Sequence, residues 1–179
     1  MLKELDKLGI DKVYYKVWDA VTEFKTTNEN ISEAHKRIIR YAKEKGLSEV
    51  IIAEDDFYFP DKLGLKYFLD NKPNDFDVYL SGVYVGFEKL SEENKKIRFF
   101  SGLHFYIVNE KFYDKFLNCN SRNAIDAEIS NLSKNGLADV YCCYPMAAIQ
   151  QETPSDNNNG MIFSHKRFEK TKVLGLCQN

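Results

Sequence analysis

Residues 50–56 read Val-Ile-Ile-Ala-Glu-Asp-Asp, an apolar run that ends abruptly in three acidic residues. A short apolar run of this kind is typical of a strand buried on both faces of a parallel sheet, so we expect the side chain of Ile51 to be buried. In open α/β sheets, ligands bind beyond the carboxyl ends of the strands. The sequence therefore predicts that Asp55 and Asp56 point into one cleft at the end of a central strand.

The three acidic side chains favour a cation at this position. Adjacent carboxylates repel one another and lose hydration beside a sheet unless a positive charge joins them. Carboxylate oxygens are the ligands that Mg²⁺ and Mn²⁺ prefer, and such sites keep positions open for phosphate. The alternative is an acidic turn in which Asp55 or Asp56 caps the next segment. The apolar strand before the acids makes the metal interpretation the stronger one.

Strand and helix patterns alternate along most of the chain on both sides of this stretch. A helix over 31–45 is expected with Asn30 as its cap and Gly46 as its stop. Further helices are expected over 2–8, 61–70, 110–117 and 124–132, and strands over 13–17, 50–53, 77–80, 97–100, 104–108 and 140–144. Helices that separate strands indicate an α/β domain with a mainly parallel sheet. We expect a single domain over 1–179 with a loop-rich tail over 152–179.

Composition and charge describe an ordinary globular chain and exclude some classes of function. The 179 residues include 25 Lys and Arg against 27 Asp and Glu, a net charge of -2. A dedicated nucleic-acid binder normally carries a basic excess, so no nucleic-acid partner is expected. No segment approaches the roughly 18 to 20 apolar residues of a membrane helix, and no signal peptide is expected. We therefore expect a cytoplasmic protein without a transmembrane segment.

The cysteines show no pattern of metal ligands. They lie at positions 119, 142, 143 and 177, without any Cys-x-x-Cys spacing. Reduced thiols are the expected state, and a zinc site is not expected. Cys142 and Cys143 lie in an apolar stretch and are expected in a buried strand.

The segment from His35 to Asp56 resembles the central signature of the family 25 glycosyltransferases, the lipooligosaccharide and collagen-type galactosyltransferases. It combines a helix with an Ala-His pair, a Gly turn and the run that ends in Glu-Asp-Asp. Further segments are similar to the family in the same order: Ser101 to Val108, the helix over 110–117, Ala124-Ile125-Asp126, Pro145 to Gln150 and Ser155-Asp156. The resemblance extends over residues 30–156, and the Glu-Asp-Asp core is its specific element.

The resemblance implies a GT-A-like fold and transfer of a sugar from a nucleotide sugar, in first place a UDP-sugar, to a hydroxyl of a glycan or protein acceptor. It also implies Mn²⁺ or Mg²⁺, held by Asp56, Asp55 and a late histidine, His165, because a divalent ion neutralises the departing diphosphate. Asp126 would be the general base for the acceptor hydroxyl. The residues implied to bind the nucleotide sugar are Glu54, Asp55, His35 and His104.

These residues also have plain structural interpretations. His35 could be a satisfied polar group on its helix, and His104 shares one side of an apolar strand with Tyr106. Asp126 could be an acid at a helix N-terminus that faces the helix dipole. His165 could belong to a solvated basic patch near the C-terminus.

Two departures from the family pattern bear on activity. Ala34 stands where the family has Ser before the histidine, which alters the expected hydrogen bonding around His35. Family members begin with a strand that helps hold the nucleotide, whereas this chain starts at the following helix. The alternative to an enzyme is therefore a shortened inactive relative, or a non-catalytic GT-A-like protein that binds nucleotide or glycan. A metal-dependent nuclease or phosphotransferase ranks last, because no expected strand carries the Lys that it would need.

Overall fold

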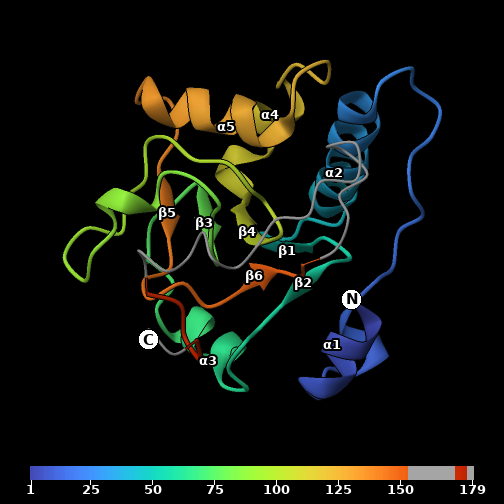
Figure 1. Cartoon of the computed structure of the whole chain (residues 1–179). Helices are drawn as coiled ribbons and strands as arrows, with labels where there is room; N and C mark the ends of the chain where they lie inside the picture. The colour runs from blue at the N-terminus through green and yellow to red at the C-terminus, as the bar shows by residue number, and fades with distance from the viewer. Residues whose placement is uncertain (153–171, 177–179) are drawn as a thin grey trace.

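A four-stranded sheet forms the middle layer of the protein, which is described by a computed structural model over residues 1–152 and 172–176 (Figure 1). The strands are β1 (Glu49–Ala53), β3 (Val78–Leu80), β4 (Phe105–Asn109) and β5 (Val140–Cys142). Their spatial order is β1-β4-β3-β5. Two short strands, β2 (Phe57–Tyr58) and β6 (Ile149–Gln150), form a separate antiparallel pair. The expected tail over 152–179 lies almost entirely outside the described residues.

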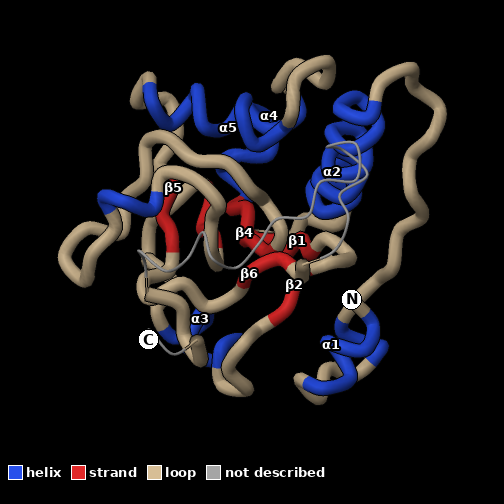
Figure 2. The backbone as a smooth tube through the Cα atoms, viewed as in Figure 1, coloured by secondary structure: helices blue, strands red, loops and turns tan. Residues whose placement is uncertain are grey.

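Helices cover both faces of this sheet (Figures 1 and 2). One face carries α2 (Thr27–Glu44), α4 (Tyr113–Leu117) and α5 (Ile125–Lys134), and the other carries α1 (Leu2–Lys7) and α3 (Gly64–Asp70). The short 3-10 turns are η1 (Lys12–Tyr14), η2 (Phe87–Lys89) and η3 (Glu110–Phe112). The expected helices are thus confirmed, with shifted ends. Within the described part of the chain, every helix is too short or too polar to cross a membrane.

Alternating strand side chains build a separate core on each face of the sheet. Val78 and Val108 pack with residues of α2, α4 and α5 on one side. Tyr79 and Ile107, their neighbours along the strands, pack on the other side in an aromatic cluster that includes Phe68 of α3. This alternation follows from the two-residue period of a strand. The sheet is therefore the middle of three layers. Cys142 and Cys143 are both buried, as expected.

The sheet is mixed, so the expectation of a mainly parallel sheet was wrong. β4 runs antiparallel to both of its neighbours, β1 and β3, whereas β3 and β5 are parallel. β1, β3 and β5 therefore share one direction, and β4 is inserted between them in reverse. A parallel neighbour needs a long crossover, usually a helix. Between β3 and β4 the chain forms only the turn η2, and β4 accordingly returns antiparallel.

β1 is an edge strand, and the expectation that Ile51 is buried in a central strand was also wrong. Ile51 is 44% exposed, whereas its neighbour Ile52 is buried. Ile52 faces the core below α2. Ile51 faces the opposite side, where the aromatic cluster is centred on β3 and β4 and leaves the edge of the sheet partly open. An apolar sequence alone did not distinguish an edge strand from a central one.

Two expected strands do not form. Residues 13–17 include the end of η1 and an irregular segment, in which Val13 and Tyr14 are 77% and 82% exposed. Their β-branched and aromatic side chains favour a strand, but no strand of the described part of the chain pairs with them. Residues 97–100 make only isolated contacts with the sheet, such as the hydrogen bond from the Ile97 amide to the Val140 carbonyl. Strand propensity was therefore insufficient where a continuous ladder was missing.

α2 begins four residues before the expected start. Its cap is Thr26, whose side chain accepts a hydrogen bond from the Glu29 amide, while the Glu29 carboxylate accepts one from the Thr26 amide. This reciprocal pair is a capping box. Asn30 instead binds the backbone of Phe24 ahead of the helix. The whole of α2 thereby has a fixed start, which matters because it carries His35.

Candidate functional site

The acidic triplet Glu54–Asp56 connects β1 to β2 and is fixed at both ends by backbone hydrogen bonds. The Glu54 amide donates to the His104 carbonyl at 2.9 Å, and the Gln151 amide donates to the Asp56 carbonyl at 2.8 Å. The triplet thus lies where the end of β1, the approach to β4 and the end of β6 meet. The side chain of Asp55 is exposed, and Asp56 is partly buried. The two acids therefore differ in exposure, and the expectation that both point into one cleft stays a prediction.

Asp56 has one satisfied and one unsatisfied carboxylate oxygen. Its Oδ2 accepts a hydrogen bond from the side-chain amide of Gln150. Its Oδ1 is buried and has no hydrogen-bond partner among the described residues. Burial and the neighbouring charges of Glu54 and Asp55 raise the pKa of Asp56 to about 7. The N-terminal ammonium of Met1, which donates to the Asp55 carbonyl, offsets this rise only in part, and a bound cation would supply a closer positive charge.

Glu54, His35 and Tyr106 form a chain of polar contacts between three elements. His35 Nε2 of α2 lies 3.5 Å from Glu54 Oε1, and His35 Nδ1 lies 2.6 Å from the Tyr106 hydroxyl of β4. The two rings are stacked, with an interplanar angle of 13°. Glu54 is an acceptor, so the proton of a neutral His35 belongs on Nε2 and the Tyr106 hydroxyl donates to Nδ1.

The chain of contacts keeps Glu54 ionised. Burial raises the pKa of Glu54, but the contact with His35 and the smaller electrostatic effects of His35 and His104 outweigh it, so the pKa lies below its ordinary value. The Glu54 side chain is 29% exposed, whereas the His35 side chain is nearly buried. Glu54 can therefore meet a ligand, while His35 acts from beneath it.

His104 is fully buried behind the acidic triplet. Its Nε2 lies 3.0 Å from the Ala148 carbonyl, so Nε2 carries the proton that is donated. Its Nδ1 has no partner among the described residues. Burial lowers the pKa of His104, which keeps the ring neutral. His104 directly precedes β4, and both His104 and Tyr106 are fully buried, so neither side chain lines an open cleft.

Asp126 lies in the first turn of α5 and binds the turn that precedes β4. Its Oδ2 accepts hydrogen bonds from the Ser101 hydroxyl and the Gly102 amide, each at 2.9 Å, and its Oδ1 accepts one from the Ala127 amide at 2.7 Å. A carboxylate offers about four acceptor positions. Asp126 thus has a structural task and retains capacity for one further donor.

The structure brings Glu54, Asp56 and His35 together and places His104 behind them. His165 lies outside the described residues. Among the residues that are described, no three His, Cys, Asp or Glu side chains converge as a ready-made metal site. A magnesium-type site needs only one or two carboxylates, because water and phosphate complete its ligand shell.

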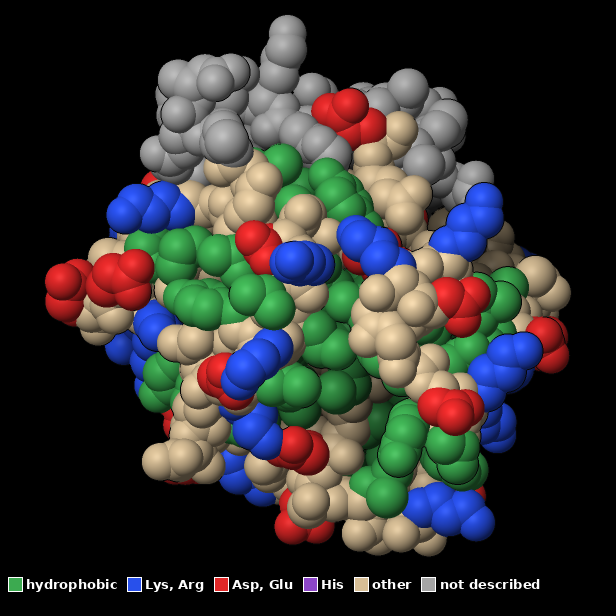
Figure 3. Space-filling model, turned by 90° about the horizontal axis from the view of Figure 1, so that it is seen from below, with side chains coloured by type: hydrophobic (Ala, Val, Ile, Leu, Met, Phe, Trp, Pro, Cys, Tyr) green, Lys and Arg blue, Asp and Glu red, His purple; other side chains and the backbone are tan. Residues whose placement is uncertain are grey.

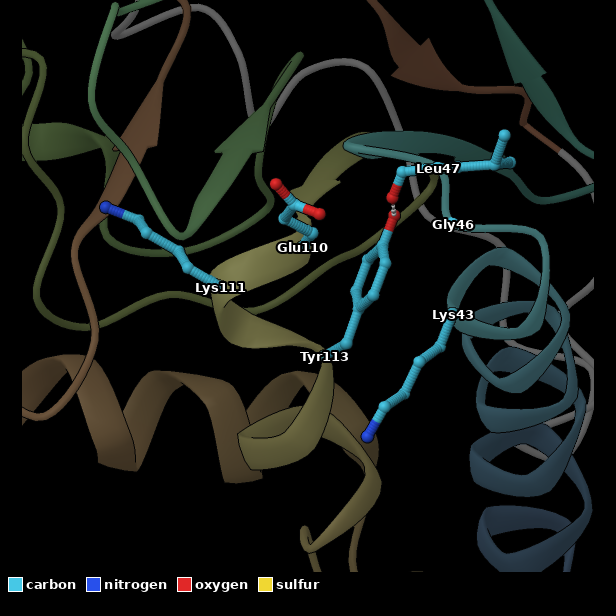
Figure 4. A pocket seen from close by; sticks show the side chains of 6 residues that line it. All are labelled: Lys43, Gly46, Leu47, Glu110, Lys111 and Tyr113. Carbon is cyan, nitrogen blue, oxygen red and sulfur yellow. Dashed lines mark hydrogen bonds between the residues drawn. The ribbon is translucent and has the colours of Figure 1, made fainter.

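Two shallow hollows lie elsewhere. One, of about 190 Å³, lies between the end of α2 and η3. Its charged side chains, those of Lys43, Glu110 and Lys111, point away from one another (Figure 4). The Tyr113 hydroxyl beside them donates to the Leu47 carbonyl. The other, of about 260 Å³, lies between α4 and α5 and is lined by residues such as Asn131. On the face seen from below, charged side chains of both signs alternate with apolar ones (Figure 3).

Tyr106, Gln150 and Tyr84 contact the site residues, although the sequence predicted no role for them. Tyr106 alternates with His104 along a strand, and this two-residue spacing was the available signal. Gln150 is the first polar residue after the apolar run of residues 145–149, which marks the point where β6 reaches the triplet. Tyr84, which donates to Gln150, had no comparable signal, because its contact depends on the folded chain.

Comparison with known proteins does not place the chain in a family: no protein-family model matches it, and no curated protein sequence matches it.

Proposed function

We propose that this protein is a metal-dependent glycosyltransferase with a GT-A-like fold, which transfers a sugar from a nucleotide sugar to a hydroxyl of a glycan or protein acceptor. The observation that carries the proposal is the buried, unpartnered Oδ1 of Asp56 beside the carboxylates of Glu54 and Asp55. The resemblance of residues 30–156 to the family 25 glycosyltransferases supports the same reaction. A UDP-sugar is the donor to test first.

The residues of the triplet fit a hard divalent cation. Asp56 offers an oxygen that lacks any partner in the described structure, and exposed Asp55 adjoins it. Both are oxygen ligands of the type that Mg²⁺ and Mn²⁺ prefer. When bound, the ion would neutralise charge on the departing diphosphate. His165 remains a proposed additional ligand on sequence grounds alone.

The remaining polar residues would position and accept protons. His35 holds the ionised Glu54 at the edge of the triplet, where Glu54 can accept hydrogen bonds from hydroxyls of the donor. Asp126 is the proposed base for the acceptor hydroxyl, through its remaining acceptor position. His104 is buried, so its proposed contact with the nucleotide sugar would be indirect, through the triplet backbone that its carbonyl binds.

The proposal is tested by calorimetry of UDP with Mn²⁺, with EDTA, and with the variant Asp56→Asn in Mn²⁺. We expect binding in Mn²⁺ and a loss of affinity of about tenfold or more in the other two conditions, because carboxylates alone repel a diphosphate. Release of UDP from a panel of UDP-sugars then measures turnover. Equal affinity under all three conditions would contradict the metal site.

A second candidate is a protein that binds nucleotide or glycan without catalysis. The observation that favours it is the engagement of Asp126 by three donors, which gives this acid a structural task. Binding of UDP in Mn²⁺ without turnover of any UDP-sugar would support this candidate. For an enzyme, Asp126→Asn should lower turnover by about 10² to 10⁴ and leave UDP affinity nearly unchanged.

A further inference from the structure

Three side chains from separate parts of the chain form a line of hydrogen bonds that ends at Asp56. The hydroxyl of Tyr84, which follows β3, donates to Oε1 of Gln150 in β6. The Nε2 amide of Gln150 then donates to Asp56 Oδ2. Tyr84 is almost entirely buried. The line thus runs from the interior of the protein to the acidic triplet.

The orientation of the Gln150 amide follows from its partners. The NH₂ group of Gln150 faces Asp56 and its carbonyl oxygen faces Tyr84. This is the orientation that the ionised form of Asp56 requires, because an ionised carboxylate can only accept. A hydroxyl can donate, and the Tyr84 hydroxyl satisfies that oxygen. The backbone of Gln150 is fixed as well, because Gln150 pairs with buried Phe57 in the β2–β6 ladder and the Gln151 amide binds the Asp56 carbonyl.

As a consequence, the two carboxylate oxygens of Asp56 have different surroundings. Gln150 occupies Oδ2, while Oδ1 is left buried without a partner in the described structure. A neutral amide can hold a carboxylate in this way without adding positive charge that would repel a cation. Carboxylates that bind metals are commonly held by hydrogen bonds of this kind, and loss of such a partner lowers metal affinity about 10- to 100-fold.

We infer that Gln150 is a positioning residue, which holds Asp56 by one oxygen so that the other is presented to a divalent cation. The inference rests on the proposed function, because it needs a cation at Asp56. It assigns Tyr84 the task of orienting Gln150. Neither residue touches the cation itself.

The test is Mn²⁺ binding without nucleotide, measured by calorimetry on wild type, Gln150→Met and the neighbouring exposed control Gln151→Met. Methionine keeps the volume of glutamine and removes its amide. We expect about 10- to 100-fold weaker binding for Gln150→Met and unchanged binding for Gln151→Met. Water-proton relaxation should show additional water on the Mn²⁺ bound to Gln150→Met, which a purely structural role of Gln150 would not produce.

Tyr84→Phe is the second variant, and it carries the test if Gln150→Met does not fold. It keeps the Gln150–Asp56 contact and removes the hydroxyl that orients the amide, so we expect a smaller loss of Mn²⁺ affinity, of about threefold or more. If Gln150→Met folds and binds Mn²⁺ with wild-type affinity, the inference is overturned. If Gln150→Met does not fold, wild-type affinity in Tyr84→Phe overturns it. Either result leaves the proposed function intact. A wild-type protein that binds no Mn²⁺, with or without UDP, would overturn both.

Discussion

Asp56 is a carboxylate whose surroundings oppose its own charge. It is partly buried, it adjoins two other acids, and the pKa of about 7 departs far from the ordinary value of 3.8. At a pH between about 3.8 and 7, the carboxyl group of Asp56 has lost its proton in the unfolded chain but retains it in the folded protein. A rise in pH across this interval therefore favours the unfolded state.

We expect Asp56→Asn to stabilise the protein, relative to wild type, more at pH 8 than at pH 5 in EDTA. From pH 5 to pH 8, the free energy of unfolding gained by Asp56→Asn over wild type should grow by about 1 to 3 kcal/mol. This range allows for solvent screening at a partly buried position. Urea unfolding at both pH values measures it. Asp19→Asn removes an exposed carboxylate and should give the same small effect at both. If the difference in free energy of unfolding between wild type and Asp56→Asn is the same at both pH values, the raised pKa of Asp56 is contradicted.

The residues of the site were partly predictable, because some of them are close in the sequence. The strand, its acids and the preceding helix are consecutive, so the closeness of Glu54, Asp56 and His35 follows from one local helix–strand unit. The contacts of Tyr106, Gln150 and Asp126 depend on pairing between distant segments. No local pattern could have shown that three donors engage Asp126 or that an amide engages Asp56.

At the scale of elements, α2 joins the two halves of the candidate site. Its His35 reaches the triplet, whereas its Lys36 reaches the loop that leads to Asp126. The ammonium of Lys36 donates to the Cys119 carbonyl and to the Ser121 hydroxyl, the latter at 2.8 Å. A buried ammonium is tolerated only with such partners. Residues 119–123 are thereby held against α2.

We expect Lys36→Met to destabilise the protein by about 1.5 to 3 kcal/mol, because hydrogen bonds to a buried charge are lost and the Cys119 carbonyl loses its donor. Urea denaturation gives the free energy of unfolding, and hydrogen exchange should quicken first in residues 119–123. Lys3→Met, which changes an exposed lysine, is the control. Unchanged exchange in this loop would show that Lys36 does not hold it.

The elements themselves were more predictable than their arrangement. Helices rest on contacts within one segment, and the expected helices all occur with shifted ends. Strand direction rests on the connection between strands: the absence of a crossover helix between β3 and β4 was the available sign that β4 is reversed. The run over 13–17 has strand-forming residues, but none of the described strands pairs with it, and strand propensity cannot supply a partner strand.

At the scale of the whole molecule, the candidate site lies at the edge of the middle layer, and a helix of an outer layer supports it. The triplet lies at the edge strand β1 beside the short β2–β6 pair, and α1 packs under the following loop. The Glu4 carboxylate accepts a hydrogen bond from the Phe59 amide at 2.9 Å, and Lys7 donates to the Phe59 carbonyl at 3.2 Å. α1 therefore holds the segment that carries Asp56 from behind.

α1 is in effect a peptide ligand that the protein carries on its own tether. Residues 11–17, which are exposed except for the partly buried Tyr15, connect it to Trp18, which packs edge-on against Tyr41 of α2. A short flexible linker gives the segment that it attaches an effective concentration in the millimolar range for binding to the rest of the protein. Cutting the tether turns the docking of α1 into an ordinary bimolecular equilibrium. Brief trypsin treatment at Lys12 or Lys16 should therefore let α1 dissociate on dilution, detected by gel filtration and mass spectrometry. A nicked protein that retains residues 1–12 at low micromolar concentration would show that its contacts suffice without the tether.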